Sequence, residues 1–421
     1  MLILKAKRDD CLAAVQAVLG TVERRHTLPI LANLLLRKTG AQIEWTSSDL
    51  EMQVRTQSQL GGDAGELATT VAARKLADIL RALPADATVS ITTAQNKLAV
   101  QADRSRFSLQ TLPAADFPLV QEAAGYGPVF SLDPGVLLAL IEQVEFAMAA
   151  HDIRYYLNGV LMVVESGLLT LVASDGNRLA LAEAAVDLDL PRQAVILPRK
   201  TVQELLRLLR EQSGEGGSPR GREQSSATSD AANDATNDAT NGATNGAKNS
   251  QASTQASVRP TADAPFNRVE VRLASAQVHF KLHQIDFVSR LVEGKYPNHS
   301  SVVPQGHPIT LQVNRAALLA SLQRVAILTS ERFRGIRLTL SSGLMRVTSN
   351  NAEHEEAVEE LEVDYSGGRV EVGFNVAYLT DVLADTRIDT VHMALRDGQS
   401  SVLFTCPQRP GFKYVVSPMR I

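Results

Sequence analysis

An internal repeat constrains the fold of this chain more than any other sequence feature. Three stretches that lie far apart carry apolar side chains three or four positions apart, the spacing that places them on one face of a helix. These stripes are Leu12, Val15, Val18 and Val22; Leu138, Ile141, Val144 and Met148; and Leu319, Leu322, Val325 and Leu328. Each is followed by a second stripe: Leu76, Ile79, Leu80 and Leu83; Val202, Leu205, Leu206 and Leu209; and Val376, Leu379 and Leu383. The chain therefore contains three copies of one unit with two helices each.

Strand-like runs lie between the two helices of every unit and end at a polar turn. Residues 42–47 precede Ser48-Asp49, residues 168–173 precede Ser174-Asp175, and residues 344–348 precede Ser349-Asn350. Each helix must bury its apolar stripe against a sheet, which predicts an α+β fold in which two helices pack on antiparallel strands. We expect domains at residues 1–126, 127–303 and 304–421.

A low-complexity insertion interrupts the second of these domains at about residues 213–258. Its composition changes to Gly, Ser, Ala, Thr, Asn and Asp, with the near-repeat NDATNDATNGATNGA at 233–247. A segment without large apolar side chains cannot offset the entropy of ordering, so a disordered loop is expected. It carries neither a charge block nor a hydrophobic anchor that would favour a binding tail.

Composition limits the class of protein and its partners. The hydrophobic share of 44% can fill two or three cores. The chain has no apolar run long enough to cross a membrane and opens without the features of a signal peptide, which predicts a cytoplasmic protein. Cys11 and Cys406, in dissimilar contexts, are expected to be reduced thiols. The net charge of −4 means that any contact with nucleic acid must depend on local patches or on topology.

Basic side chains gather on the outer faces of the predicted helices. They are Arg8, Arg24, Arg25, Arg74, Lys75, Arg81, Arg199, Lys200, Arg207, Arg210 and Arg324. Taken alone, they fit solvated helix faces as well as a nucleic-acid surface. Three domains that present such helices on the same side favour the nucleic-acid interpretation.

Enzyme chemistry finds little support in the sequence. The chain lacks the glycine-rich loop with lysine that holds nucleotide phosphates. His279 and His283 are four apart but lie in a strand-like alternation with no further ligand, and no metal or other cofactor is expected. Asp49 and Asp175 occupy equivalent positions of two repeats, which should place them too far apart for paired carboxylate chemistry. A scaffold that binds only proteins remains an alternative to nucleic-acid binding.

Short motifs in all three domains match the pattern of one known family. The first domain shows HTLPILANLLL at 26–36, SDLEM at 48–52, RSRFSL at 104–109 and LPAADFP at 112–118. The second shows DIRYYLNG at 152–159, ASDGNRLA at 173–180 and LPRK at 197–200. The third shows RFRG at 332–335, NN at 350–351, GFN at 373–375 and VVSPMRI at 415–421. Together these motifs resemble the family of the DNA polymerase III beta subunit, the bacterial sliding clamps, and they follow the family's order along nearly the whole chain outside the insertion.

The resemblance implies a non-catalytic processivity factor. Two chains would join head to tail into a ring of six domains around duplex DNA, with helices lining the hole. Its implied partners are the DNA polymerase III catalytic subunit, the clamp loader, other polymerases and repair proteins. By resemblance, the dimer interface comprises apolar Phe107, Leu109, Ile327 and Leu328, and the pairing of Lys75, Arg104 and Arg106 with Glu353, Glu356 and Glu359. Without the family, Phe107 fits an ordinary core and the acidic run a solvated face.

The resemblance also implies two binding surfaces. Its candidates for phosphate contacts with DNA are Arg25, Arg74, His151, Tyr155, Tyr156 and Lys200. A pocket for short peptides of partner proteins would comprise Arg154, Leu157, Ser174, Gly176, Asn177, Arg178, Leu179, Pro297, Val302, Val415, Ser417, Pro418, Met419 and Arg420. Asn177 stands where the family more often has histidine, and Ser417 where it has methionine, which leaves the peptide preference open. On the residues alone, the two tyrosines fit packing and Gly176 a turn.

Overall fold

The computed structural model describes residues 1–23, 28–213, 268–330, 334–384 and 388–420. The predicted insertion lies outside the described residues except for Ser213, and so does the DNA candidate Arg25. Among the described residues, no helix is both long and apolar enough to cross a membrane.

Three units follow one another along the chain. The first comprises β1 (Leu2–Lys7), α1 (Arg8–Leu19), β2 (Asn33–Thr39), β3 (Gln42–Ser48), β4 (Met52–Gln59), β5 (Glu66–Ala72), α2 (Ala73–Ala82), β6 (Thr88–Ala94), β7 (Lys97–Ala102) and β8 (Ser105–Gln110). The second comprises β9 (Phe130–Leu132), α3 (Pro134–Val144), β10 (Gly159–Glu165), β11 (Leu168–Ser174), β12 (Arg178–Ala185), β13 (Gln193–Pro198), α4 (Arg199–Gln212), β14 (Val269–Leu273), β15 (Gln277–Leu282) and β16 (Ile285–Arg290). The third comprises β17 (Ile309–Asn314), α5 (Arg315–Ala326), β18 (Gly335–Ser341), β19 (Leu344–Asn350), β20 (Glu356–Glu362), β21 (Val370–Asn375), α6 (Val376–Leu383), β22 (Thr390–Leu395), β23 (Val402–Cys406) and β24 (Arg409–Val416).

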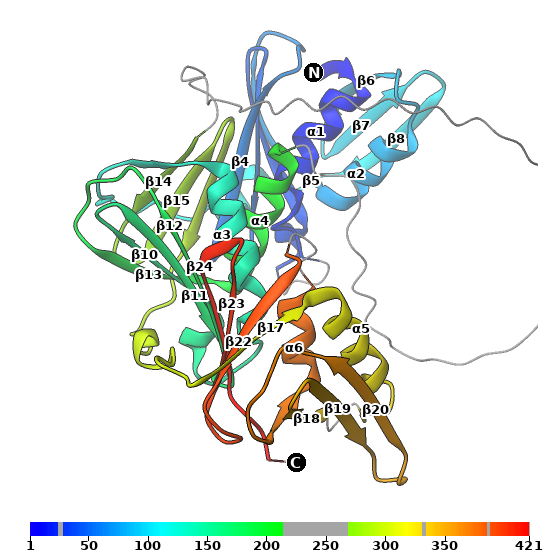
Figure 1. The fold of residues 1–421 in the computed structure, drawn as a ribbon. Coiled ribbons are helices and arrows are strands. Elements are labelled where there is room, and N and C mark those ends of the chain that lie inside the picture. Colours follow the sequence, from blue (N-terminus) through cyan, green and yellow to red (C-terminus); the bar gives the residue numbers. More distant parts are fainter. Residues whose placement is uncertain (24–27, 214–267, 331–333, 385–387, 421) are drawn as a thin grey trace, which may run out of the picture.

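Short 3-10 helices complete the units: η1 (Pro29–Ala32) and η2 (Ala114–Asp116) in the first, and η3 (Glu145–Ala147), η4 (Tyr155–Leu157) and η5 (His299–Ser301) in the second. Every unit has the same order of one strand, a helix, four strands, a second helix and three strands, as the repeat predicts. The helices pack in pairs, α1 with α2, α3 with α4 and α5 with α6. Figure 1 shows the units as an arc, with the helices on its inner side and the sheets outside.

The helices bury their apolar stripes as expected. The first helix of each unit, however, ends before the last residue of its stripe. Helix α1 ends at Leu19, before Val22, and α3 ends at Val144, before Met148. In α5 the buried apolar side chains are Leu318, Leu322 and Val325, while Leu319 is only partly buried and Leu328 lies beyond the helix end. Stripe spacing alone cannot show where a helix stops, because residues after the last turn can continue the buried face.

The strands of one unit do not form one sheet, which corrects the simple picture of two helices on a sheet within each unit. All sheets are antiparallel, and two of them cross from one unit to the next. Their orders are β5-β2-β3-β4-β16-β15-β14-β9 and β13-β10-β11-β12-β24-β23-β22-β17. The remaining strands form two smaller sheets, β1-β6-β7-β8 and β20-β19-β18-β21, at the two ends of the arc. The units are therefore joined by continuous strand pairing, β4 with β16 and β12 with β24.

The outer edges of the two small sheets differ. The edge of β1 is covered, because Lys5 donates its N–H to the Leu60 carbonyl and Asp63 donates to the Leu2 carbonyl. The edge of β21 is covered as well, by a hydrogen bond from the Met419 N–H to the Gly373 carbonyl. Within the described part of the chain, no backbone hydrogen bond reaches the outer edge of β8 or β20. These two strands are therefore open edges.

A second, smaller core lies on the outer face of the sheet that joins the second and third units. The main core fills the space between helices and sheets, whereas this cluster includes Leu157, Leu179, Tyr296 and Val415. Several strands here are buried on both faces, as in β10, where only the last residue is exposed. The chain after β16 covers part of the outer face, and residues of this segment line one side of the cavity described next.

Candidate binding sites

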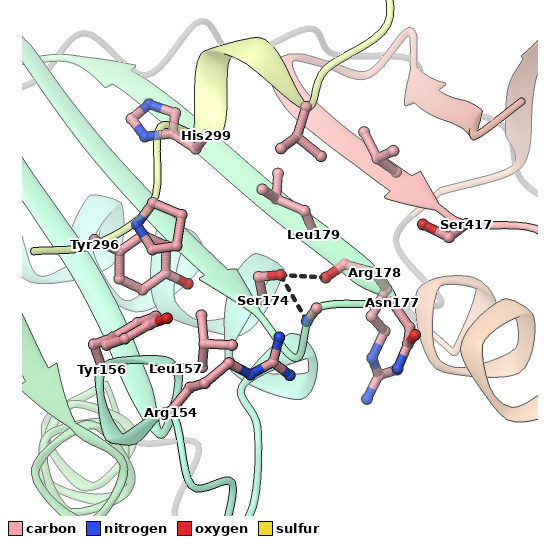
Figure 2. A pocket seen from close by; sticks show the side chains of 14 residues that line it. Arg154, Tyr156, Leu157, Ser174, Asn177, Arg178, Leu179, Tyr296, His299 and Ser417 are labelled. Atoms are coloured by element: carbon pink, nitrogen blue, oxygen red, sulfur yellow. Dashed lines mark hydrogen bonds between the residues drawn. The ribbon is translucent and has the colours of Figure 1, made fainter.

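A tight turn at residues 174–178 connects β11 to β12 and forms one wall of a cavity. The Ser174 hydroxyl donates to the Arg178 carbonyl and accepts the Gly176 N–H, as Figure 2 shows. The Asp175 carboxylate accepts the N–H groups of Asn177 and Arg178. Gly176 has a φ of 92°, a conformation that favours glycine. The Ser-Asp-Gly sequence therefore builds a rigid turn whose third position has no side chain.

The cavity has a volume of about 220 Å³ and opens at the joint between the second and third units. It is lined by Arg154, Tyr156, Leu157, Ser174, Gly176, Asn177, Arg178, Leu179, Tyr296, Pro297, His299, Val302, Val415 and Ser417. Most of the predicted pocket residues are thus brought together. Pro418, Met419 and Arg420 are not among the lining residues.

Three lining residues lay outside the predicted pocket. The resemblance assigns Tyr156 to the DNA contacts and implies no role for Tyr296 and His299. Both residues lie within two positions of Pro297, which the resemblance assigns to the pocket. Their closeness to Pro297 in the sequence is therefore the one signal that could have indicated them. Both side chains line the cavity, Tyr296 just before η5 and His299 at its first position.

Both arginines that line the cavity are neutralised within the chain. Arg154 lies 2.7 Å from Asp152, and its hydrogen bond lowers the pKa of that carboxyl to about 2. Arg178 lies 3.0 Å from Asp175 and 2.7 Å from Asp381. Burial alone would lower the pKa of Arg178, but Tyr414 and Asp381 raise it overall, so its charge persists. The cavity therefore offers apolar surface more than net charge.

Tyr296 and His299 add uncharged polar groups to the wall. Burial lowers the pKa of His299, so the imidazole is neutral near pH 7. Burial also raises the pKa of Tyr296, which keeps its hydroxyl protonated. That hydroxyl is buried and makes no hydrogen bond to a described residue within normal geometry. The cavity wall is thus mainly hydrophobic and carries few polar groups. This composition is typical of pockets that bind small ligands.

The predicted DNA residues within the described part of the chain lie on separate elements of the first two units. Arg74, in the first turn of α2, donates to the Val22 carbonyl at 2.6 Å. His151 is exposed with a φ of 58°, and Tyr155 is 58% exposed. The Tyr155 and Tyr156 rings meet edge to face at 5.9 Å, and Tyr156 turns toward the cavity.

Lys200, in the first turn of α4, is not an isolated cation. Its ammonium lies 2.5 Å from Glu23 and 3.4 Å from Asp49, both in the first unit. Burial alone would lower the pKa of Lys200, but the hydrogen bond to Glu23 and the charge of Asp49 raise it overall. Two carboxylates around one ammonium leave a local charge of −1. Lys200 therefore links the second unit to the first by ion pairs and does not present a free positive charge.

Most other basic helix residues are likewise partnered within the chain. Arg207 bonds Glu204 and Glu211 and donates to the carbonyls of Gln16 and Ala17 near the end of α1. Further pairs join Arg210 to Glu142, Arg81 to Asp78 and Arg324 to Glu359. The inner side is therefore less cationic than its lysine and arginine content suggests.

The predicted dimer residues lie at the two ends of the arc. Arg104 and Arg106 are exposed, and Phe107 and Leu109 half-buried, on or beside the open edge strand β8. Lys75 is exposed on α2. At the other end, Ile327 is 78% exposed and Leu328 half-buried after α5, while Glu353 and Glu356 are exposed beside or on β20. Glu359 is already bonded to Arg324 and Ser321 of its own chain.

The residues considered for catalysis and metal binding have local structural partners. His279 lies 3.0 Å from Asp286, whose pKa it lowers, and His283 occupies a turn. Asp49 caps its turn by accepting the N–H groups of Glu51 and Met52. Across the described ranges, no group of three or more histidine, cysteine, aspartate or glutamate residues is arranged to hold a metal ion.

Comparison with known proteins agrees with this geometry. Residues 2–121, 131–215 and 300–420 match the N-terminal, central and C-terminal domains of the DNA polymerase III beta subunit. The beta sliding clamp of Pseudomonas aeruginosa is 39% identical over 99% of both chains, and that of Escherichia coli K12 is 35% identical over 99% of both. The crystal structure of the P. aeruginosa subunit superposes with a TM-score of 0.83, at 38% identity and 100% coverage of both chains. A P. aeruginosa clamp bound to griselimycin superposes at 0.82, with 37% identity and the same coverage.

Three repeated units, a helical inner side and a cavity at one joint define a binding protein of the clamp class. The chain belongs to the DNA polymerase III beta subunit family, the sliding clamps. Like its relatives, it is a non-catalytic processivity subunit of the replicative polymerase.

Proposed function

We propose that two copies of this chain close head to tail into a ring that encircles duplex DNA and tethers the replicative polymerase to it. One observation carries the proposal: both internal joints use equivalent strands. The third of the four strands between the helices pairs with the last strand of the following unit, β4 with β16 and β12 with β24. By the same rule, β20 of one chain should pair with β8 of another. In a head-to-tail dimer the second copy supplies this strand.

The chemistry of the two open edges supports this joint. Strand β8 carries Arg106, and β20 carries exposed Glu356 and Glu360, so opposite charges would meet across the pair. Exposed Ile327 and the half-buried Phe107 supply apolar surface beside them. An open edge strand in solution can pair non-specifically with other chains. In a closed ring, the open edges β8 and β20 of each chain are both paired.

A ring holds DNA by enclosing it, which suits a chain with a net charge of −4. Contacts inside should be few and made to phosphates without base recognition. Exposed Arg74, His151 and Tyr155 can make them, together with Arg25. Lys200 can contribute when a phosphate displaces Glu23 from its ammonium.

The cavity at the second joint is proposed to hold short peptide segments of partner proteins. Its apolar lining and its internally neutralised arginines favour large uncharged side chains as anchors. The related P. aeruginosa clamp that binds griselimycin, a peptide-like ligand, makes this compound a probe for the cavity. The proposed partners are the polymerase III catalytic subunit, the clamp loader, other polymerases and repair proteins, all met in the cytoplasm.

Sedimentation of the purified chain tests the ring. We expect a mass of twice 45.4 kDa for the wild type. Arg106→Glu should dissociate the dimer, because it places a carboxylate opposite the acidic strand β20. Arg37→Glu, an exposed arginine on the interior strand β2, is the matched control and should leave the dimer intact. A wild-type chain that sediments only as a monomer would overturn the proposal.

A further inference from the structure

One side chain of the third unit, that of Asp381, contacts the turn 174–178. Arg178 donates from Nη1 to Asp381 at 2.7 Å, and Asp381 lies on α6. It also donates from Nη2 to the Phe146 carbonyl at 2.7 Å and from Nε to Asp175 at 3.0 Å. The guanidinium therefore links the cavity wall in the second unit to a helix of the third.

The donors of Arg178 are committed to the protein. All three guanidinium nitrogens donate inside the chain, and the group stacks on the Tyr378 ring at 4.6 Å and on Phe146 at 5.8 Å. Its side chain is only 10% exposed. Arg178 thus lines the cavity without offering a charge to a ligand, and its function there is to hold the turn.

A second arginine holds the same turn from the opposite side. Arg154 donates to the Asp175 carbonyl at 3.1 Å, and its guanidinium fills the space where a side chain on Gly176 would lie. The Ser417 N–H also donates to the Asn177 carbonyl at 2.8 Å. Arg154 belongs to the same unit as the turn, whereas Asp381 acts from the next unit. The side of the turn held by Asp381 therefore depends on how the two units are placed.

We propose that Asp381 is a positioning residue for the peptide cavity. By holding Arg178 it adds a side-chain tie to the pairing of β12 with β24, and so fixes the turn 174–178 against Val415 and Ser417 of the third unit. Partner affinity then depends on an ion pair between two units, made behind the cavity by a residue outside its lining. This inference rests on the proposed function of the cavity as a peptide site.

Calorimetric titration with griselimycin tests the inference on full-length dimers. Asp381→Ala should weaken binding about tenfold, because it leaves the buried guanidinium without one of its two carboxylates. Asp381→Glu keeps the charge and should restore most of the affinity, while the near-isosteric Asp381→Asn should lie between them. The matched control is Asp78→Ala, which removes the partner of Arg81 on α2 and should leave the affinity unchanged.

The double variant separates positioning from general damage to the fold. If Asp381 acts through Arg178, then Asp381→Ala should have little further effect on affinity in an Arg178→Ala background. An undiminished effect in that background, or wild-type affinity in Asp381→Ala, would overturn the inference. A wild-type chain that does not bind griselimycin would instead refute the proposed peptide site, and the inference would fall with it.

Discussion

The turns 48–52 and 174–178 occupy equivalent positions in two units and are built in the same way. In each, a serine hydroxyl accepts the N–H of the third residue, and an aspartate accepts the next two. The third residue has a positive φ in both, 78° at Leu50 and 92° at Gly176. The first turn thus carries a leucine where the second has no side chain, and the cavity is found at the second.

Both turns are also tied to the second helix of the following unit, but by different chemistry. Asp49 forms an ion pair with Lys200 of α4 directly. Asp175 forms an ion pair with Arg178 of its own turn, and Arg178 forms a second ion pair with Asp381 of α6. The comparison shows how one repeated joint can be a plain connection at one place and can form a cavity at another. The second joint differs from the first by a glycine, a bridging arginine and an aspartate on α6.

The first joint should show the largest loss of stability when its buried charge is left unpaired. Arg207 is bonded to Glu204, which is only 5% exposed, so Arg207→Ala should lower the free energy of unfolding by about 3 kcal/mol. Arg81→Ala, whose partner Asp78 is largely exposed, should cost less than about 1 kcal/mol. Urea denaturation of both variants measures the difference, and equal costs would contradict this view of the joint.

Making the second turn resemble the first should destroy the cavity. Gly176→Leu places a side chain where the Arg154 guanidinium lies, at a φ that leucine adopts with strain. We expect griselimycin affinity to fall about a hundredfold or more and stability to fall by about 1 to 2 kcal/mol. Retained affinity, measured by calorimetry, would show that this position does not define the site.

Acidification should weaken binding at the second joint only. Burial lowers the pKa of His299, with Glu183 opposing and Arg192 adding to the effect, so the folded protein favours neutral imidazole. Its contribution to stability is therefore lost as the pH falls below the unfolded pKa of about 6.5, and a ligand that buries it further should lose affinity there. Between about pH 8 and pH 5.5 we expect a several-fold loss of griselimycin affinity. His299→Gln should flatten this dependence; an unchanged slope would exclude His299 as its cause.

The reverse change in the first turn should have the smallest effect. Leu50→Gly relieves a positive φ at a side chain that is 40% exposed. The gain offsets the greater entropy of glycine in the unfolded chain, so stability should change by less than about 1 kcal/mol in either direction. Thermal denaturation measures it. A loss of several kcal/mol would mean that Leu50 contributes to packing at this joint.

Much of this architecture could be predicted from local sequence patterns. The helical stripes and the Ser-Asp turns depend on residues close together in the chain, and the structure confirms the stripes and the turns at 48–52 and 174–178. The third turn was expected at Ser349-Asn350, but both residues belong to strand β19. Most of the cavity lining, including Leu157 and Leu179, was instead expected from the resemblance to a known family, because no local pattern marks those residues. The helix ends were less accurate, since Val22 and Met148 continue the buried face after the helices have ended.

Contacts between units were not predictable in the same way. Period-two alternation shows which face of a strand is buried, but it does not reveal that β4 pairs with β16 across a joint. Lys200 was identified as a cation, but nothing in the sequence indicated that Glu23 and Asp49 surround it. Asp381 carries no signal at all, because its importance depends on Arg178, which is 203 residues away in the chain.

Retention on DNA tests the central proposal most directly. The clamp would be loaded onto a nicked circular plasmid by a clamp loader, separated from free protein, and followed after the circle is cut once. An enclosing ring should remain on the intact circle at high salt and slip off within minutes of linearisation, because topology and not phosphate affinity holds it. A clamp that dissociates equally from circular and linear DNA would contradict the account.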